Sequence, residues 1–193
     1  IATSNHEHYL SNGQTKRTEH LEVGDLLETH WSPLSHSPAG DVVLHEWQLG
    51  WLGVLLGDGC LRRQDAGFTA SPGNRVLADL PPCPPGTYVN QVAVKEYRVA
   101  LIPPKRNYNP LVQWMKSLGL WGLKSGQKFV PDCVFKQTPQ GIAFFLRHLW
   151  NCDGSWNEPG RQAVLTTISR QLAFDVKYLL WSIGVYASVG EAH

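Results

Sequence analysis

The feature that most constrains this chain is an apolar helical segment that occurs twice and ends each time at an aspartate followed by glycine. The first segment, 43–56, spaces its large apolar residues so that they bury one face of a helix, and Asp58 follows it. The second segment, 141–150, is also strongly apolar and is followed by Asp153. Glycine takes up left-handed backbone conformations at little cost and therefore commonly ends helices. The repetition predicts two related halves, each built on one buried helix.

The two aspartates point to a metal site. The C-terminal end of a helix carries partial negative charge, so a carboxylate placed there calls for a compensating cation. If the two helices pack together, Asp58 and Asp153 form a carboxylate pair suited to Mg²⁺, which prefers carboxylate and water oxygens and usually also contacts phosphate. The alternative is that each is an ordinary helix-ending turn, because Asp-Gly is among the commonest turn dipeptides. The repetition favours the metal site.

The two segments resemble the LAGLIDADG motifs of homing endonucleases, in the form embedded in inteins. Residues 48–59 are similar to the first motif, 144–156 to the second, and 164–185 to the segment that follows the second motif. The second motif is especially similar to inteins of replicative DNA helicases. The resemblance implies an α+β fold, a monomeric LAGLIDADG saddle of αββαββα-type pseudo-repeats whose sheets lie along the major groove of double-stranded DNA.

The resemblance also implies catalytic roles. Asp58 and Asp153 would bind Mg²⁺, for which Mn²⁺ substitutes, beside the scissile phosphates. The family lysine that lies shortly before a proline between the motifs falls on Lys128, with Lys124 as the alternative. This lysine would orient the attacking water or stabilise charge at the phosphate. A solvated surface cation is the competing interpretation for either lysine.

Helix packing and DNA contacts follow from the same resemblance. Gly53 falls where a small residue lets the motif helices approach closely, whereas His148 occupies the matching place in the second helix and departs from the pattern. Strands expected over 61–70 and 91–102 would face DNA, with alternate residues pointing to solvent. Their candidate DNA-binding residues are Arg62, Arg63, Lys95 and Arg98.

The N-terminal region has a different character. Residues 1–40 are net acidic and the remainder is net basic, which favours two units. We predict part of an intein splicing (Hint) domain over 1–32, a Ser/Pro/Gly-rich linker over 33–42, and the endonuclease domain over 43–193 with an incomplete second half. Thr3 and His6 resemble the splicing block that assists the acyl shift at the N-terminal scissile peptide, for which imidazole is suited near pH 7.

Composition excludes several other classes. Hydrophobic residues make up 42% and charged residues 17%, which does not fit a disordered tail. No apolar run reaches the roughly 18 residues needed to cross a membrane, and a cytoplasmic location is expected. The four cysteines form no C-x-x-C pair, so neither a zinc site nor a disulfide framework is expected.

The sequence therefore predicts an intein-encoded homing endonuclease. It would make a site-specific double-strand break at the intein insertion site, in a host that is a replicative DNA helicase. The chain has neither a nucleophile at its start nor a His-Asn pair at its end, so we expect a fragment that does not splice itself. One alternative is a degenerate, non-cleaving domain that supports splicing or binds DNA, which His148 favours. A transcription regulator or RNA maturase on the same scaffold is a third, but it leaves Thr3 and His6 unexplained.

Overall fold

The computed structural model describes residues 4–27, 43–61, 65–103 and 108–191. The chain divides into two compact units, Ile1–Ser32 and Pro33–His193. Within the described residues, no helix is long and apolar enough to cross a membrane.

The first unit is small and built on a hairpin. Strand β1 (Glu7–Tyr9) pairs antiparallel with β2 (Thr15–Arg17), and a short 3-10 helix, η1 (Thr18–His20), follows directly. Lys16 Nζ donates to the carboxylate of Asp25 at 2.9 Å, which ties the hairpin to the chain beyond η1. This unit has little apolar core, because Leu10 is its one buried hydrophobic residue among those described.

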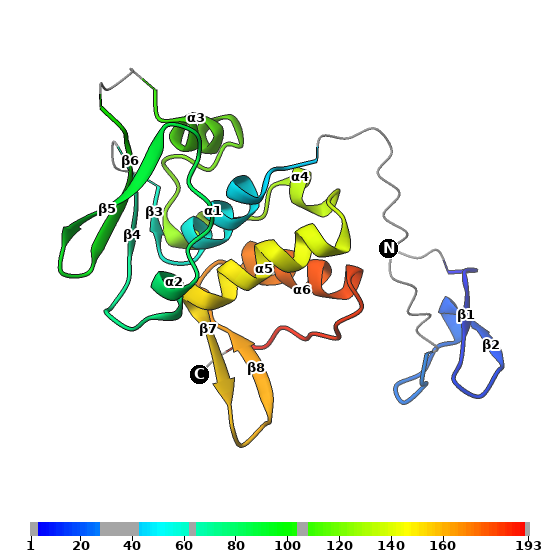
Figure 1. The fold of residues 1–193 in the computed structure, drawn as a ribbon. Helices are drawn as coiled ribbons and strands as arrows, with labels where there is room; N and C mark the ends of the chain where they lie inside the picture. Colours follow the sequence, from blue (N-terminus) through cyan, green and yellow to red (C-terminus); the bar gives the residue numbers. More distant parts are fainter. Residues whose placement is uncertain (1–3, 28–42, 62–64, 104–107, 192–193) are drawn as a thin grey trace. The chain divides into compact units, whose positions relative to one another are not determined.

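The second unit begins with a complete αββαββα sequence of elements (Figure 1). Its strands form a four-stranded antiparallel sheet in the order β3-β4-β6-β5. The elements are α1 (Glu46–Leu56), β3 (Gly59–Cys60), β4 (Ala66–Thr69), α2 (Arg75–Ala78), β5 (Thr87–Ala93), β6 (Glu96–Leu101) and α3 (Pro110–Ser117).

One face of this sheet packs on α1. Phe68 of β4 stacks on Tyr97 of β6 at a centroid distance of 5.4 Å, and Trp51 of α1 lies 5.7 Å from Phe68. The segment expected as one strand over 91–102 instead contains the end of β5, a turn at Val94 and Lys95, and β6. Within the described part of the segment expected over 61–70, residues Ala66–Thr69 form a strand.

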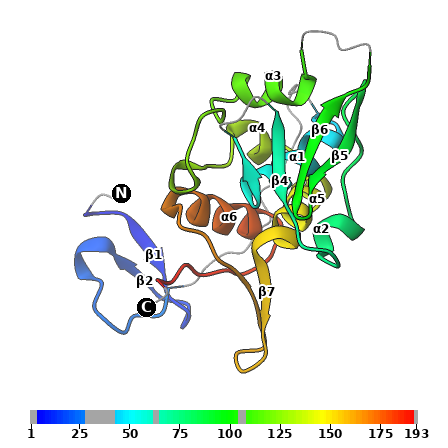
Figure 2. The same cartoon turned by 90° about the vertical axis from the view of Figure 1, so that its left-hand side faces the viewer.

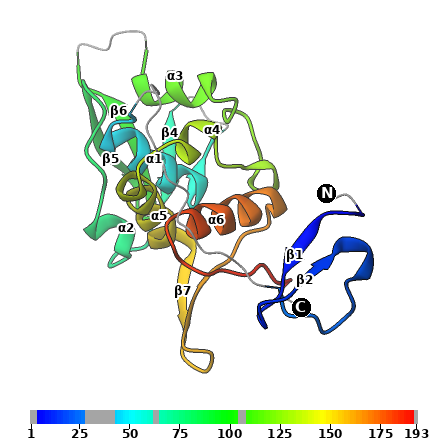
Figure 3. The same cartoon turned by 90° about the vertical axis from the view of Figure 1, so that its right-hand side faces the viewer.

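The remaining elements repeat the first part of this order. Helix α5 (Pro139–Asp153) leads into the antiparallel hairpin of β7 (Gly154–Asn157) and β8 (Gln162–Leu165), and α6 (Arg170–Ser182) follows. A 3-10 turn, η2 (Ser125–Gln127), and α4 (Asp132–Phe135) connect the two halves. The β7–β8 hairpin extends away from the helices in all three views (Figures 1, 2 and 3). The fold class is α+β, as the sequence predicted.

Helices α1 and α5 lie against each other at the centre of the second unit (Figure 3). A Cβ atom on Gly53 would lie 2.6 Å from the carbonyl oxygen of Phe145 and 2.8 Å from the amide nitrogen of Leu149. The backbones therefore touch, with no space for a side chain between them. Because α1 also packs on the sheet, it is buried on every side from Leu49 to Leu56, as expected of a helix that is apolar all round.

This close approach generates a stability prediction. Gly53→Ala should lower the free energy of unfolding by about 2–3 kcal/mol, because the new methyl group meets backbone atoms that cannot rotate away. Gly126→Ala is the matched control, since its nearest neighbour would be the carbonyl oxygen of Ile168 at 3.8 Å. Urea denaturation measures both, and a wild-type midpoint for Gly53→Ala would contradict the proposed backbone contact.

Candidate active site

The ends of α1 and α5 bring two acidic residues together. Asp58 lies two residues beyond the end of α1, and Asp153 is the last residue of α5. A Cβ atom on Gly57 would lie 3.5 Å from Oδ2 of Asp153, so the second acid reaches the turn that carries the first. Burial raises the pKa of Asp58, and burial followed by the charge of Asp58 raises the pKa of Asp153. The pair is a concentration of negative charge that a cation would stabilise.

The two acids have equivalent backbone environments. The amide nitrogen of Thr69 donates to the carbonyl oxygen of Asp58 at 3.3 Å, and that of Thr166 donates to the carbonyl oxygen of Asp153 at 3.3 Å. In each half the chain leaves the acid, forms a two-stranded hairpin and returns to the same carbonyl. The sequence repeat is therefore also a repeat of backbone geometry.

Lys128 lies next to the turn that carries the first acid, and its exposed fraction is 3%. Its ammonium group is within hydrogen-bonding distance of four carbonyl oxygens at the end of α1, namely those of Leu55 (3.0 Å), Leu56 (2.9 Å), Gly57 (2.9 Å) and Gly59 (3.1 Å). Burial lowers the pKa of Lys128, while the charges of Asp153 and Asp58 oppose that shift. The lysine thus neutralises the negative end of α1. Lys124, the alternative from the sequence, is exposed.

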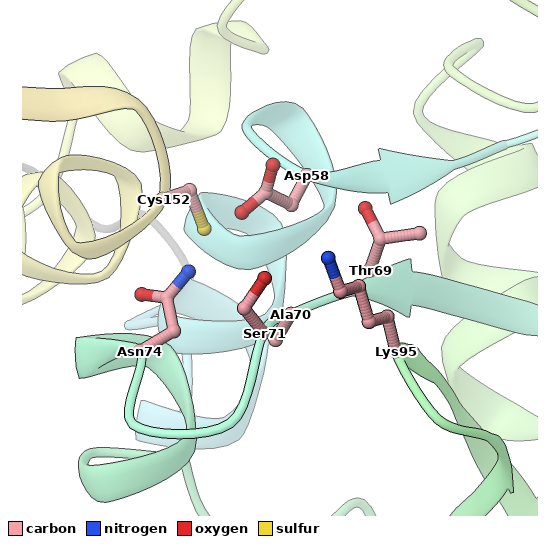
Figure 4. Close-up of a pocket in the computed structure, with 7 residues that line it drawn as sticks. All are labelled: Asp58, Thr69, Ala70, Ser71, Asn74, Lys95 and Cys152. Carbon is pink, nitrogen blue, oxygen red and sulfur yellow. The ribbon is translucent and has the colours of Figure 1, made fainter.

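A cavity of about 240 Å³ opens beside Asp58. Lys95 lies at the β5–β6 turn, and its ammonium group points into the cavity (Figure 4). The cavity lining is mostly polar and comprises Asp58, Thr69, Ala70, Ser71, Asn74, Lys95 and Cys152. The space is therefore suited to an anionic group that Lys95 would attract.

Cys152 separates the cavity from the helix interface. Its Sγ lies 3.4 Å from the carbonyl oxygen of His148 and 3.7 Å from that of Val54. Burial raises the pKa of the Cys152 thiol to about 12. The thiol is therefore uncharged at neutral pH and leaves the two carboxylates as the anionic groups at the helix ends.

His148 occupies the α1–α5 interface, opposite the glycines of α1. Its ring packs edge-on against Phe144 at 4.7 Å, and its Cβ would lie 3.0 Å from a Cβ on Gly53. The residue is 2% exposed, and neither ring nitrogen has a hydrogen-bond partner within the described part of the chain. Burial lowers the pKa of His148, so the imidazole is neutral at pH 7.

The other residues singled out from the sequence lie elsewhere. Arg98 of β6 is paired with Asp65 at 3.5 Å. His6 is exposed in the first unit, and its ring lies 5.1 Å from that of His8. Thr3, Arg62, Arg63 and the linker 33–42 lie outside the described residues.

Sequence reasoning missed three residues that shape this site. A Cβ on Gly50 would collide with Pro81 and lie 3.1 Å from the ring of His148 in α5, and a Cβ on Gly57 would collide with Cys152 of α5. Their spacing of three and four residues from Gly53 places all three glycines on one helix face and could have revealed them. Asp79, which receives hydrogen bonds from Arg147 and from Asn151 of α5, carried no such signal.

Comparison with known proteins identifies a family for the C-terminal part of the chain. The family model of the LAGLIDADG-like domain matches residues 141–192, a stretch that covers most of α5, the β7–β8 hairpin and α6. Residues 141–192 are thus similar to a LAGLIDADG-like domain, which agrees with the second of the two predicted motifs, and the first, 48–59, lies outside this match.

Relatives extend the similarity over nearly the whole chain. It is 36% identical to the replicative DNA helicase DnaB of Rhodothermus marinus, over 96% of this chain and 21% of the helicase. It is 31% identical to DnaB of Synechocystis sp., over 98% of this chain and 23% of that protein. The replication factor C small subunit of Methanocaldococcus jannaschii is 27% identical, over 93% of this chain and 10% of the subunit. The predicted resemblance to a segment of replicative helicases is confirmed, and the chain spans about a fifth of their length.

The raised pKa of the second acid gives a prediction about stability. Asp153→Asn should increase the free energy of unfolding at pH 7 by up to about 1 kcal/mol in EDTA, because the ionised carboxylate is partly desolvated and faces Asp58. The difference should shrink as the pH falls through the raised pKa, where the wild-type carboxylate takes up a proton. Urea melts at several pH values test this, with the exposed Asp132→Asn as control. If Asp153→Asn were less stable than the wild type at pH 7, the ionised Asp153 carboxylate would not be destabilising the fold.

His148 gives a prediction of opposite pH dependence. His148→Leu should increase the free energy of unfolding at pH 7 by about 1 kcal/mol, because it removes buried nitrogens that lack partners. Since burial lowers the folded pKa, the unfolded chain binds the proton first, and the wild type should lose stability as the pH falls below about 6.5. The variant should lack this loss, whereas the exposed His20→Leu control should retain it. If the free energy of unfolding changed with pH in the same way for wild type and His148→Leu, this account would be wrong.

Proposed function

We propose that this chain is the endonuclease part of an intein and that it hydrolyses both strands of double-stranded DNA at a specific site. The observation that carries the proposal is the pair of partly buried carboxylates at two adjacent helix ends, with a buried lysine beside them. The match of residues 141–192 to the LAGLIDADG-like domain supports the assignment to a nuclease scaffold.

A divalent cation fits this pair. Asp58 and Asp153 would hold Mg²⁺, or Mn²⁺ in its place. Burial raises the pKa of both carboxyls, and the charge of Asp58 raises that of Asp153 further, so a bound cation would favour their ionised forms. Within the described residues no group of three or more His, Cys, Asp or Glu side chains could hold a metal. A two-carboxylate site suits an ion that completes its shell with water and phosphate oxygens. The bound metal would supply Lewis acidity and a more acidic water molecule.

The surrounding residues have complementary roles. Lys128 holds the end of α1 and supplies positive charge next to the carboxylates, which favours an anionic transition state. Lys95 would bind a phosphate oxygen in the cavity beside Asp58. Because the thiol of Cys152 stays neutral, it would add no thiolate ligand, and the donors beside the metal would remain the oxygens that Mg²⁺ prefers.

Double-stranded DNA is the proposed partner of the sheet. The face opposite α1 carries Arg98, which is directly paired with Asn90 across the β5–β6 ladder. Such side chains can donate hydrogen bonds to base edges in the major groove, which admits a β-ribbon. Arg62 and Arg63, just before β4, would add phosphate contacts that make binding depend on salt.

Intein origin is supported by where the similarity recurs. The same segment matches part of a helicase and part of a replication factor C subunit, two proteins with different names and different coverage. A segment shared in this way is characteristic of an inserted element. We propose a replicative DNA helicase as the host extein, with the first unit contributing to a splicing domain in which Thr3 and His6 assist cleavage of the N-terminal peptide bond.

Cleavage tests the proposed function. The protein should linearise a plasmid that carries the uninterrupted host helicase gene in Mg²⁺, and Asp58→Asn or Asp153→Asn should slow this by roughly a thousandfold or more. Asp132→Asn, an exposed carboxylate in α4, should cleave like the wild type. Full activity in the Asp58→Asn plus Asp153→Asn protein would contradict the catalytic assignment.

A second candidate is a non-cleaving DNA-binding domain. It is favoured by His148 at the helix interface, whose ring nitrogens have no hydrogen-bond partner among the described residues. Specific binding of the same DNA without cleavage in Mg²⁺ or Mn²⁺ would select this function over the nuclease.

A further inference from the structure

The segment that carries Lys128 is fastened to the start of α6. The hydroxyl of Ser169 donates to the carbonyl oxygen of Lys128 at 2.5 Å, and the amide of Val130 donates to Oδ2 of Asp175 at 2.9 Å. Ser169 is fully buried and Asp175 is 7% exposed. These two hydrogen bonds hold the backbone of Lys128 and of Val130, and together they fix the position and the direction of this segment.

Both anchoring side chains are themselves held by α6. Oγ of Ser169 accepts a hydrogen bond from the amide of Leu172 at 3.2 Å and so caps the helix N-terminus. Oδ1 of Asp175 accepts one from Gln171 Nε2 at 2.8 Å. The Ser169 hydroxyl therefore donates its hydrogen to Lys128 and accepts one from the helix backbone. These bonds fix the orientations of the Ser169 and Asp175 side chains.

The anchor connects the two repeats. Helix α6 follows β8 and belongs to the second repeat, whereas the carbonyl oxygens that receive the Lys128 ammonium belong to the end of α1 in the first. The lysine is thus held at its backbone by one repeat and at its side chain by the other. Its position relative to Asp58 depends on both ends of this connection.

We infer that Ser169 and Asp175 are positioning residues that act through Lys128 in the cleavage reaction, an inference that rests on the proposed function. Displacement of a catalytic group by about an ångström can reduce a rate roughly a hundredfold, so loss of this anchor should reduce catalysis rather than DNA binding.

Single-turnover cleavage tests the catalytic part. Ser169→Ala should slow cleavage roughly tenfold or more with little change in DNA affinity, and Ser169→Thr, which keeps the hydroxyl, should restore most of the rate. In a Lys128→Met background, Ser169→Ala should cause no further loss, because its effect passes through the lysine. Thr138→Ala, which removes the N-cap of α5 instead, should cleave like the wild type. Fully additive losses in the Ser169→Ala plus Lys128→Met protein would overturn the inference.

Amine labelling tests the anchor without any cleavage. With N-acetoxysuccinimide and peptide mass spectrometry, Lys128 should react slowly relative to the exposed Lys124 in the same molecule. Ser169→Ala should raise the Lys128:Lys124 ratio roughly tenfold, about the effect of one lost hydrogen bond, and Thr138→Ala should leave it unchanged. An unchanged ratio in Ser169→Ala would overturn the anchor. A wild-type protein that never cuts DNA would defeat the proposed nuclease function, whereas the labelling ratio would still decide whether the anchor exists.

Discussion

The backbone contact between α1 and α5 is the constraint on which the rest of this structure depends. Because residue 53 is glycine, the two helices lie so close that a methyl group at this position of α1 would collide with backbone atoms of α5. At that separation the two helix ends lie side by side, and the acids that follow them share one site. A larger residue would force the helices apart and move the carboxylates with them. The contact that packs the two helices therefore also sets the distance between the two acids of the site.

Electrostatics oppose this arrangement. Two helix ends of partial negative charge meet, each with an aspartate, and both carboxylates are partly desolvated. Lys128 offsets part of this charge through the carbonyl oxygens of α1, and its backbone is in turn held by Ser169 and Asp175. What remains uncompensated is the feature that would favour a metal ion and an anionic substrate. Strain of this kind is expected where a site is organised for binding rather than for stability.

Much of the fold could be predicted because its signals are local. Apolar periodicity identified α1 and α5, and the Asp-Gly pairs marked the helix ends. The β5–β6 hairpin was predicted as one strand, because its turn at Val94 and Lys95 contains neither glycine nor proline. Short strands such as β3 and β7 carry too few residues for a period of two to be visible. Arg98 was predicted as a DNA-binding residue, but its ion pair with Asp65 carried no local signal, because the two residues are distant in sequence.

The sequence by itself determined the two helices, their terminal acids and the glycine at position 53 between them, since spacing along one helix fixes which residues share a face. Only the tertiary structure decided how these parts act on one another. It placed the acids at adjacent helix ends, buried Lys128 against four carbonyl oxygens, and attached that lysine to α6. The reason is physical: desolvation and hydrogen bonding between distant segments depend on which surfaces meet, and no local pattern encodes that meeting.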